Sequence, residues 1–403
     1  MIHRLQSLLG ANAVTPGHAG GIPRVAPHDE EECALLLGEA TAEGWRVRIE
    51  GGGTWNPLDA PADIALTTRR MNVRVAVSPA DLVATVSAGV SWDDLRTQLA
   101  EHGVWIPADP PGGDRTVGSI VATATTGSLR TGFGPIRGHV LGLTLVTGDG
   151  RIIRVGGKVV KNVAGFDLAK LAAGSFGAFG VVTSVHFRLR SVPRADTTLV
   201  VNGKRHSLIK TALNIAAEHI TPAALEVVSP TAGNHGEWTL AVRIVGSDAG
   251  VREQKAAIAA AARPSSLNTL SATDASLFWQ SLRTRAMDAP TTIRCGTVPS
   301  GLGEALDTVQ HHLDENSEDW ITVATLSGMV RWSGRVTAER IKLFRYVAAQ
   351  REIPVTLERA DWNVRSAVGH FGAYREGVGR LVSALRRTFD PASVLVVPID
   401  DHT

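Results

Sequence analysis

The ten residues WRVRIEGGGT (45–54) carry the strongest local signal in the sequence. Their first half alternates between apolar and polar side chains, which predicts a strand, and three glycines follow directly. Glycines leave successive backbone N–H groups free to turn toward one point, where they form a nest for an anion. A dinucleotide pyrophosphate can be held in this way, although a plain tight turn explains the glycines equally well.

Other phosphate-binding and hydrolytic motifs are missing around this signal. GGGT (51–54) is not followed by Lys-Ser or Lys-Thr, which excludes a Walker A loop. No G-x-G-x-x-G opens a helix after a strand, so we do not expect a Rossmann site. G-x-S-x-G and H-E-x-x-H are absent as well, so a hydrolase has no support.

Composition restricts the class of protein further. A chain of 403 residues suggests two or three domains. The net charge of +2 and the aromatic content of 5% argue against nucleic-acid binding. Cys33 and Cys295 match no disulfide framework, which predicts buried, reduced thiols and a cytoplasmic setting. No apolar run approaches the ~18–20 residues of a membrane span, so we expect membrane contact only through a partner.

The flanking sequence predicts alternating helices and strands. A helix is expected over 28–44, because acidic residues fill its first turn and Gly44 ends it, and another over 91–103, opened by Ser91. Further strands are expected at 24–27, 74–79, 81–89 and 181–193, with a hairpin at 139–156. Past Pro193, strands alternate with helices at about 206–219, 250–262, 337–350 and 374–388, which predicts a second α+β layer.

Two stretches are unusually poor in side chains. Residues 104–137 are expected to form a long loop, and within it TVGSIVATATTG (116–127) lets the main chain approach a ligand closely. Glycines at 174, 177 and 180 precede an apolar strand. Tight Ala/Gly packing and a glycine helix cap explain these features without a ligand, whereas a bare surface for a large, flat molecule explains both together.

The order of these motifs resembles the vanillyl-alcohol oxidase (PCMH-type) superfamily of FAD-binding domains. KVVKNVAGFDLAKL (158–171), with PADPP (107–111), resembles more narrowly the FAD-binding E subunits of bacterial glycolate oxidases. The likeness covers residues 1–193 well and the remainder only in its layout. It implies an α+β fold: a two-subdomain FAD-binding domain over 1–193, then a smaller α+β cap domain with an antiparallel sheet over 194–403.

The resemblance also implies a set of FAD-binding residues. The amides of the nest would hold the pyrophosphate, with Trp55 beside them, and Val182 would meet the adenine. The nest comprises Gly51, Gly52, Gly53 and Thr54; the residues lining the isoalloxazine and ribityl chain would be Pro110, Pro111, Thr116, Gly118, Ser119, Ala122, Thr123 and Gly127. Lys161 and Asn162 would fix their own segment or contact a neighbouring subunit.

Catalytic residues cannot be assigned from the sequence. Residues 325–334 stand where the sister catalytic subunits carry a metal-binding His segment, and they contain neither His nor Asp, so no metal site is expected. Arg331 is a candidate for binding a substrate carboxylate, or an ordinary exposed strand residue. His139 is a candidate base or a structural histidine. Adjacent His311 and His312 point apart on a helix and are rejected as metal ligands.

The resemblance implies a FAD-binding subunit of a glycolate oxidase-like complex. Such a complex oxidises a 2-hydroxy acid to a 2-oxo acid by hydride transfer to flavin. Electrons would pass to an iron–sulfur subunit, because two cysteines are too few to hold a cluster, and a catalytic flavoprotein subunit would be a second partner. Two alternatives are a stand-alone FAD-dependent dehydrogenase and a flavin-free scaffold, the latter suggested by departures from the family pattern at Ser119, Ala124 and Gly138.

Overall fold

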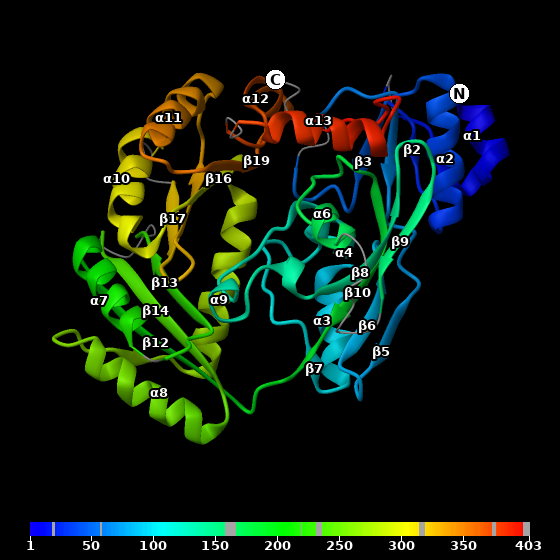
Figure 1. Ribbon diagram of the computed structural model, residues 1–403. Helices are drawn as coiled ribbons and strands as arrows, with labels where there is room; N and C mark the ends of the chain where they lie inside the picture. The colour runs from blue at the N-terminus through cyan, green and yellow to red at the C-terminus, as the bar shows by residue number, and fades with distance from the viewer. Residues whose placement is uncertain are drawn as a thin grey trace.

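The computed structural model describes residues 1–17, 21–56, 59–157, 167–218, 220–230, 236–313, 319–372 and 376–397. The chain forms two halves that lie side by side, and its C-terminal helix returns across the top of the first half (Figure 1). Among the described residues, no helix combines the length and the apolarity that a membrane span requires.

A small sheet opens the first half. Its strands follow the order β1 (Val14–Thr15), β2 (Arg24–Val25), β4 (Ile64–Thr67) and β3 (Val47–Glu50), and the last three run parallel. Helices α1 (Ile2–Leu9) and α2 (Glu30–Glu43) pack on this sheet. Asp29 caps α2 by accepting the backbone N–H of Glu32 at 2.8 Å, and Gly44 ends the helix in the left-handed conformation. The predicted helix over 28–44 is therefore confirmed.

A five-stranded antiparallel sheet completes this half. Its order is β5 (Val75–Ser78), β6 (Val83–Ser87), β10 (Val181–Arg188), β8 (Val140–Val146) and β9 (Ile152–Gly156), and β8 and β9 form the predicted hairpin. Helix α3 (Trp92–Glu101) begins at Ser91 as expected, and Trp92 packs edge-on against Phe187 of β10. The small helix α6 (Leu168–Ala172) packs on β8 and β9, and α5 (Arg130–Phe133) contacts the second half. The short strands β7 (Val104–Trp105) and β11 (Arg190–Ser191) pair with each other.

The expected loop over 104–137 is wrong at its centre, where α4 (Val117–Thr123) forms. Thr116 caps this helix by accepting the backbone N–H of Ser119 at 3.4 Å, and Ala124 ends it at a φ of 48°. The helix is possible despite its small residues because one face packs on the five-stranded sheet, burying Val117, Ile120 and Val121.

The second half is built on an eight-stranded antiparallel sheet, the largest in the described part of the molecule. Its order is β15 (Asn268–Thr269), β12 (Ala195–Gly203), β14 (Trp238–Gly246), β13 (Ala224–Val228), β17 (Trp320–Ala324), β18 (Met329–Gly334), β16 (Thr291–Gly296) and β19 (Val355–Arg359). We refer to this half as the cap. The predicted α+β fold with an antiparallel-sheet cap is confirmed.

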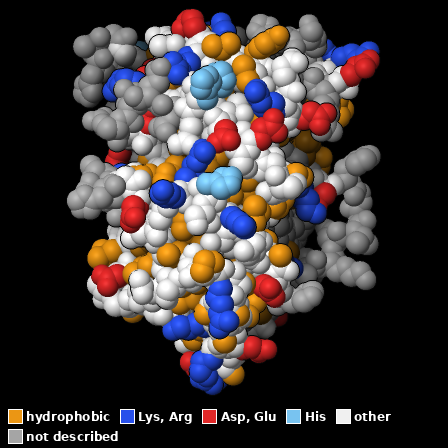
Figure 2. Space-filling model, turned by 90° about the vertical axis from the view of Figure 1, so that its left-hand side faces the viewer, with side chains coloured by type: hydrophobic (Ala, Val, Ile, Leu, Met, Phe, Trp, Pro, Cys, Tyr) orange, Lys and Arg blue, Asp and Glu red, His pale blue; other side chains and the backbone are white. Residues whose placement is uncertain are grey.

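The two faces of the cap sheet differ because side chains alternate along a strand. Leu225, Ile321 and Val330 belong to the apolar face, which is covered by α7 (Arg205–Ala217), α8 (Asp248–Ala261), α10 (Leu302–Leu313) and α11 (Ala338–Gln350). Acidic and basic side chains are interspersed on the outside of these helices (Figure 2). The opposite face carries Glu226 and Arg331, faces the first half, and is partly covered by α9 (Ala272–Asp288).

The C-terminal segment returns to the first half. After α12 (Trp362–Val368), α13 (Val378–Phe389) packs Phe389 against Phe179, with ring centroids 5.4 Å apart. Val47 of β3 then donates its backbone N–H to Val394 at 2.7 Å and accepts that of Val396 at 2.9 Å. A boundary at residues 193 and 194 stays a prediction, but residues 378–397 pack with the first half, which the sequence did not predict.

Candidate functional site

A groove of about 970 Å³ brings together three stretches that are far apart in the sequence. It is lined by the turn after β3, by one face of α4 and by residues 176–182, with Trp362, Arg365 and His370 of the C-terminal segment closing one side. The predicted FAD-binding residues that line it are Gly51, Gly53, Thr54, Trp55, Gly118, Ser119, Ala122, Thr123 and Val182.

The other predicted residues lie beside the groove, at a second cavity between the halves, or outside the described residues. Gly52 is inside the same turn, and Thr116 caps α4. Pro111 and Gly127 line a separate cavity between the halves, and the Pro110 carbonyl accepts the guanidinium of Arg283 at 3.4 Å. Lys161 and Asn162 lie outside the described residues.

Glycine is required in the groove for two different reasons. A Cβ on Gly51 would stand 2.3 Å from Oγ1 of Thr116, and one on Gly118 would stand 2.9 Å from Cβ of Ala88, so side chains there would push α4 away. Gly177 and Gly180 instead adopt positive φ angles of 85° and 136°, where other residues are strained. The glycines before β10 therefore serve the backbone turn as well as the wall of the groove.

Unsatisfied polar atoms mark the groove as a binding site. Oγ1 of Thr54, Oδ1 of Asn56 and Oγ1 of Thr68 are buried there, and none has a hydrogen-bond partner among the described residues. Leaving a buried polar group unpaired costs about 1–3 kcal/mol, so such atoms indicate a missing polar ligand. A glycine turn together with these groups fits the phosphates and sugars of a dinucleotide.

Trp55 and Arg115 stand at the end of the groove nearest the cap. The indole Nε1 of Trp55 donates to the carbonyl of Glu358 at 2.8 Å, and the guanidinium of Arg115 lies 4.2 Å from the centre of the indole ring. Arg115 is fully buried and donates to Thr123 Oγ1 at 2.8 Å; burial lowers its pKa to about 9. Trp55 thus joins the halves where the groove meets the cap, and Arg115 supports its ring from the first half.

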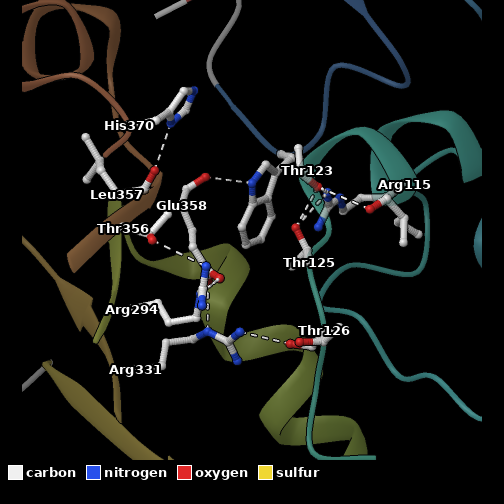
Figure 3. A network of polar contacts seen from close by, with 12 residues as sticks. Arg115, Thr123, Thr125, Thr126, Arg294, Arg331, Thr356, Leu357, Glu358 and His370 are labelled. Atoms are coloured by element: carbon white, nitrogen blue, oxygen red, sulfur yellow. Dashed lines mark hydrogen bonds and ion pairs between the residues drawn. The ribbon is translucent and has the colours of Figure 1, made fainter. Parts of the chain in front are cut away.

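A buried ion network continues from this point across the cap sheet (Figure 3). Glu358 accepts Nε of Arg331 at 2.9 Å and Nε of Arg294 at 2.8 Å. Nη2 of Arg331 reaches the first half and donates to the carbonyl of Thr126 at 2.9 Å. Burial alone would raise the pKa of Glu358, but the two arginines hold it below its ordinary value. Arg331 is thus a buried network residue and not an exposed one.

The cavity between the halves has an empty volume of about 390 Å³. The first half contributes Asp109 and Ser128, and the cap contributes Glu226, Thr322 and Arg331. Burial raises the pKa of Glu226 to about 8, against the opposing effects of a hydrogen bond to Ser128 and the charge of Arg331. Sequence reasoning missed Glu226, although a single acid inside the apolar strand ALEVV was a visible signal.

His139 lies elsewhere and is structural. Its ring is buried at the start of β8, and it lines neither the groove nor the cavity. Burial, together with the charges of Arg188 and Arg190, lowers its pKa to about 4. Cys33 and Cys295 are buried free thiols, as predicted. In the described part of the chain, no three His, Cys, Asp or Glu side chains gather as a metal site would need.

The fold and the groove define a class of protein. Residues 23–156 match the family of FAD binding domains. This part of the chain is an FAD-binding domain, and FAD is its cofactor. The solved structure of alkyldihydroxyacetonephosphate synthase has the same fold, with a TM-score of 0.70 at 16% identity, covering 92% of this chain and 75% of that one.

Comparison with curated relatives indicates more narrowly which proteins this chain is similar to. A D-lactate dehydrogenase of Archaeoglobus fulgidus is 33% identical over 230 residues, covering 56% of this chain and 51% of the relative. The glycolate oxidase subunit GlcE of Escherichia coli is 34% identical over 175 residues, covering 41% of this chain and 49% of the relative. The chain thus spans about half the length of these relatives. The predicted resemblance to glycolate oxidase subunits is confirmed.

Proposed function

We propose that the protein is the FAD-binding subunit of a glycolate oxidase-like complex that oxidises a small 2-hydroxy acid to the 2-oxo acid. The observation that carries the proposal is the groove, where a glycine turn, a helix of small residues and unpaired polar atoms meet in an FAD-binding domain. When bound, FAD supplies an acceptor for the hydride that leaves C2 of the acid.

Each part of the chain has a distinct task in this proposal. The amides of Gly51, Gly52, Gly53 and Thr54 hold the pyrophosphate, since backbone N–H groups in a nest neutralise an anion without a lysine. Thr54, Asn56 and Thr68 offer their unpaired side-chain oxygens to hydroxyl groups of the cofactor. Arg331, held by Glu358 beside the cavity, attracts the substrate carboxylate, and the surrounding burial excludes water.

The partners are a catalytic flavoprotein subunit and an iron–sulfur subunit. Support comes from relatives named as subunits of glycolate oxidase and from the two cysteines of this chain, which are too few for a cluster. In such a complex this subunit holds a second FAD that relays electrons or supports assembly.

One observation favours a flavin-free scaffold as the second candidate. Trp55 and Arg115 fill the space between groove and cavity and bind one another, Glu358 and Thr123. A flavin that extends from the nest toward the cap would need this pair to move. In a scaffold the pair would instead be a permanent contact between the halves.

The experiment is to purify the full chain, alone and with its native companions, and to record the visible spectrum. We expect flavin absorbance, or quenching of flavin fluorescence when FAD is titrated into the chain alone. Failure to hold or take up FAD in either preparation would contradict the proposal and favour the scaffold. Anaerobic addition of glycolate then tests whether the chain is reduced without a partner, as a stand-alone dehydrogenase would be.

A further inference from the structure

We propose that the cavity between the halves binds the carboxylate group of a small organic acid, with Arg331 as the cation and Glu226 as a hydrogen-bond donor. The inference deepens the proposed function and rests on it, because it assigns a substrate-recognition role to Glu226. The cavity exists only where both halves meet.

Strand register places the cap residues together. Thr322 of β17 lies directly opposite Arg331 of β18, and Glu226 of β13 is two positions further along, opposite Ala324 of β17. All three belong to the face that is turned away from the apolar core of the cap. Asp109 and Ser128 of the first half close the cavity from the other side.

Arg331 is only partly used by the protein. Its Nε donates to Glu358 and its Nη2 to Thr126, each at 2.9 Å. In the described part of the chain, its third nitrogen, Nη1, has no hydrogen-bond partner. A guanidinium offers five N–H groups in a fixed fork, so those on Nη1 remain for a ligand in the cavity. A carboxylate is the anion whose geometry matches them.

Glu226 is built to stay protonated. Only 3% of the residue is exposed, and burial raises its pKa to about 8. The charged and titratable groups around it are Arg331 on β18, which favours ionisation, and Asp109 of the first half, which opposes it. Arg243 of β14 and Arg283 of α9 act on Asp109, whose own pKa is raised by burial and which accepts the backbone N–H of Leu129 at 2.9 Å.

Protonation decides which ligand the cavity prefers. At neutral pH the carboxyl of Glu226 offers an O–H group, so a ligand carboxylate can accept from Glu226 and from Arg331 together. Above a pH of about 8 the same carboxyl becomes an anion and repels the ligand. Affinity for a small carboxylate is therefore expected to fall as pH rises, in a range where the ligand itself does not change charge.

The test uses oxalate, a two-carbon carboxylate with no C–H bond to oxidise, titrated calorimetrically into the FAD-loaded full chain. We expect wild type and Glu226→Gln to bind within about threefold of each other at pH 7. Between pH 7 and pH 9.5 the wild type should lose about thirtyfold in affinity and Glu226→Gln should lose none. Arg331→Met should lose at least about tenfold at every pH. Glu253→Gln, on the exposed surface of α8, is the matched control and should behave as wild type.

The outcomes separate this inference from the proposed function. Wild-type affinity that does not change with pH, or a tenfold loss in Glu226→Gln at pH 7, would overturn the role of Glu226. If glycolate reduces the flavin and oxalate binds equally well to all variants, the proposed function stands and the proposed carboxylate site in the cavity is wrong. The expected pH dependence in a chain whose flavin no hydroxy acid reduces, even in the presence of its native companions, would mean the reverse. Circular dichroism of each variant shows whether it has folded.

Discussion

The two halves of the molecule present their polar groups in different ways. The groove of the first half is made mainly of main chain, at glycines and small residues that allow close approach. The cavity on the cap side is made of charged side chains at alternate positions of a sheet, held by one another. A main-chain site tolerates little added volume, whereas a side-chain site tolerates little change of charge. The predictions below test that contrast.

The largest effect is expected when charge is removed on the cap side. Glu358→Gln leaves the buried Arg331 and the partly exposed Arg294 without their shared anion and should lower the free energy of unfolding by about 3–5 kcal/mol. Thermal unfolding measures the loss. Glu304→Gln, which breaks only an exposed ion pair with Arg351, should change stability by less than about 0.5 kcal/mol. Equal losses of stability in the two variants would contradict the expectation that the cap site is sensitive to a change of charge.

Acid should destabilise the contact between the C-terminal segment and the groove. His370 stacks on Phe176 at 4.0 Å and donates from Nδ1 to the carbonyl of Leu357, and burial lowers its pKa to about 4. Because the unfolded chain takes up a proton below about pH 6.5 and the folded chain does not, stability is lost as pH falls. From pH 7 to pH 5 the loss from this group is about 2 kcal/mol. In His370→Gln, denaturant unfolding at the two pH values should show a correspondingly smaller difference.

Added volume should be harmful in the first half. In Gly51→Ala the new methyl group collides with Oγ1 of Thr116, so the turn shifts and FAD affinity should fall at least about tenfold. A fluorescence titration with FAD measures this. Gly138→Ala is the control, since a Cβ there meets no atom within 4 Å. If Gly51→Ala binds FAD as well as the control does, the groove is not a main-chain site.

The smallest effect concerns a single hydroxyl in the groove. Thr54→Val keeps the shape of the side chain and removes the unpaired Oγ1, which should weaken FAD binding about fivefold. The same titration measures it, and thermal unfolding of the cofactor-free variant should show no loss of stability. Unchanged FAD affinity would mean that this hydroxyl does not face the cofactor.

The sequence predicted those helices whose ends are set by residues next to them in the chain. Asp29, Gly44 and Ser91 act within a few residues of themselves, and the helices they bound form as expected. The glycines after β3 could be proposed early as a nest because a turn is a local feature, although a plain tight turn explained them equally well. Helix α4 was missed because its stability comes from packing on a sheet and not from its small side chains.

Side-chain sites were harder to predict because they depend on register. Nothing near Arg331 in the sequence indicates that Glu358 is its partner or that Thr126 of the other half accepts its N–H group. Glu226 was visible as a lone acid in an apolar strand, but its surroundings come from Ser128 and Asp109, about 100 residues away. Distant pairs of this kind follow from topology, which a single sequence does not reveal.

The return of residues 394–396 to β3 has a consequence for biogenesis. The β3 edge of the small sheet is covered only when residues 394–396 have been synthesised, because Val47 exchanges its backbone hydrogen bonds with Val394 and Val396. The first half is thus completed only after the cap has been made, and a chain stopped before residue 394 would expose an unpaired edge to other strands.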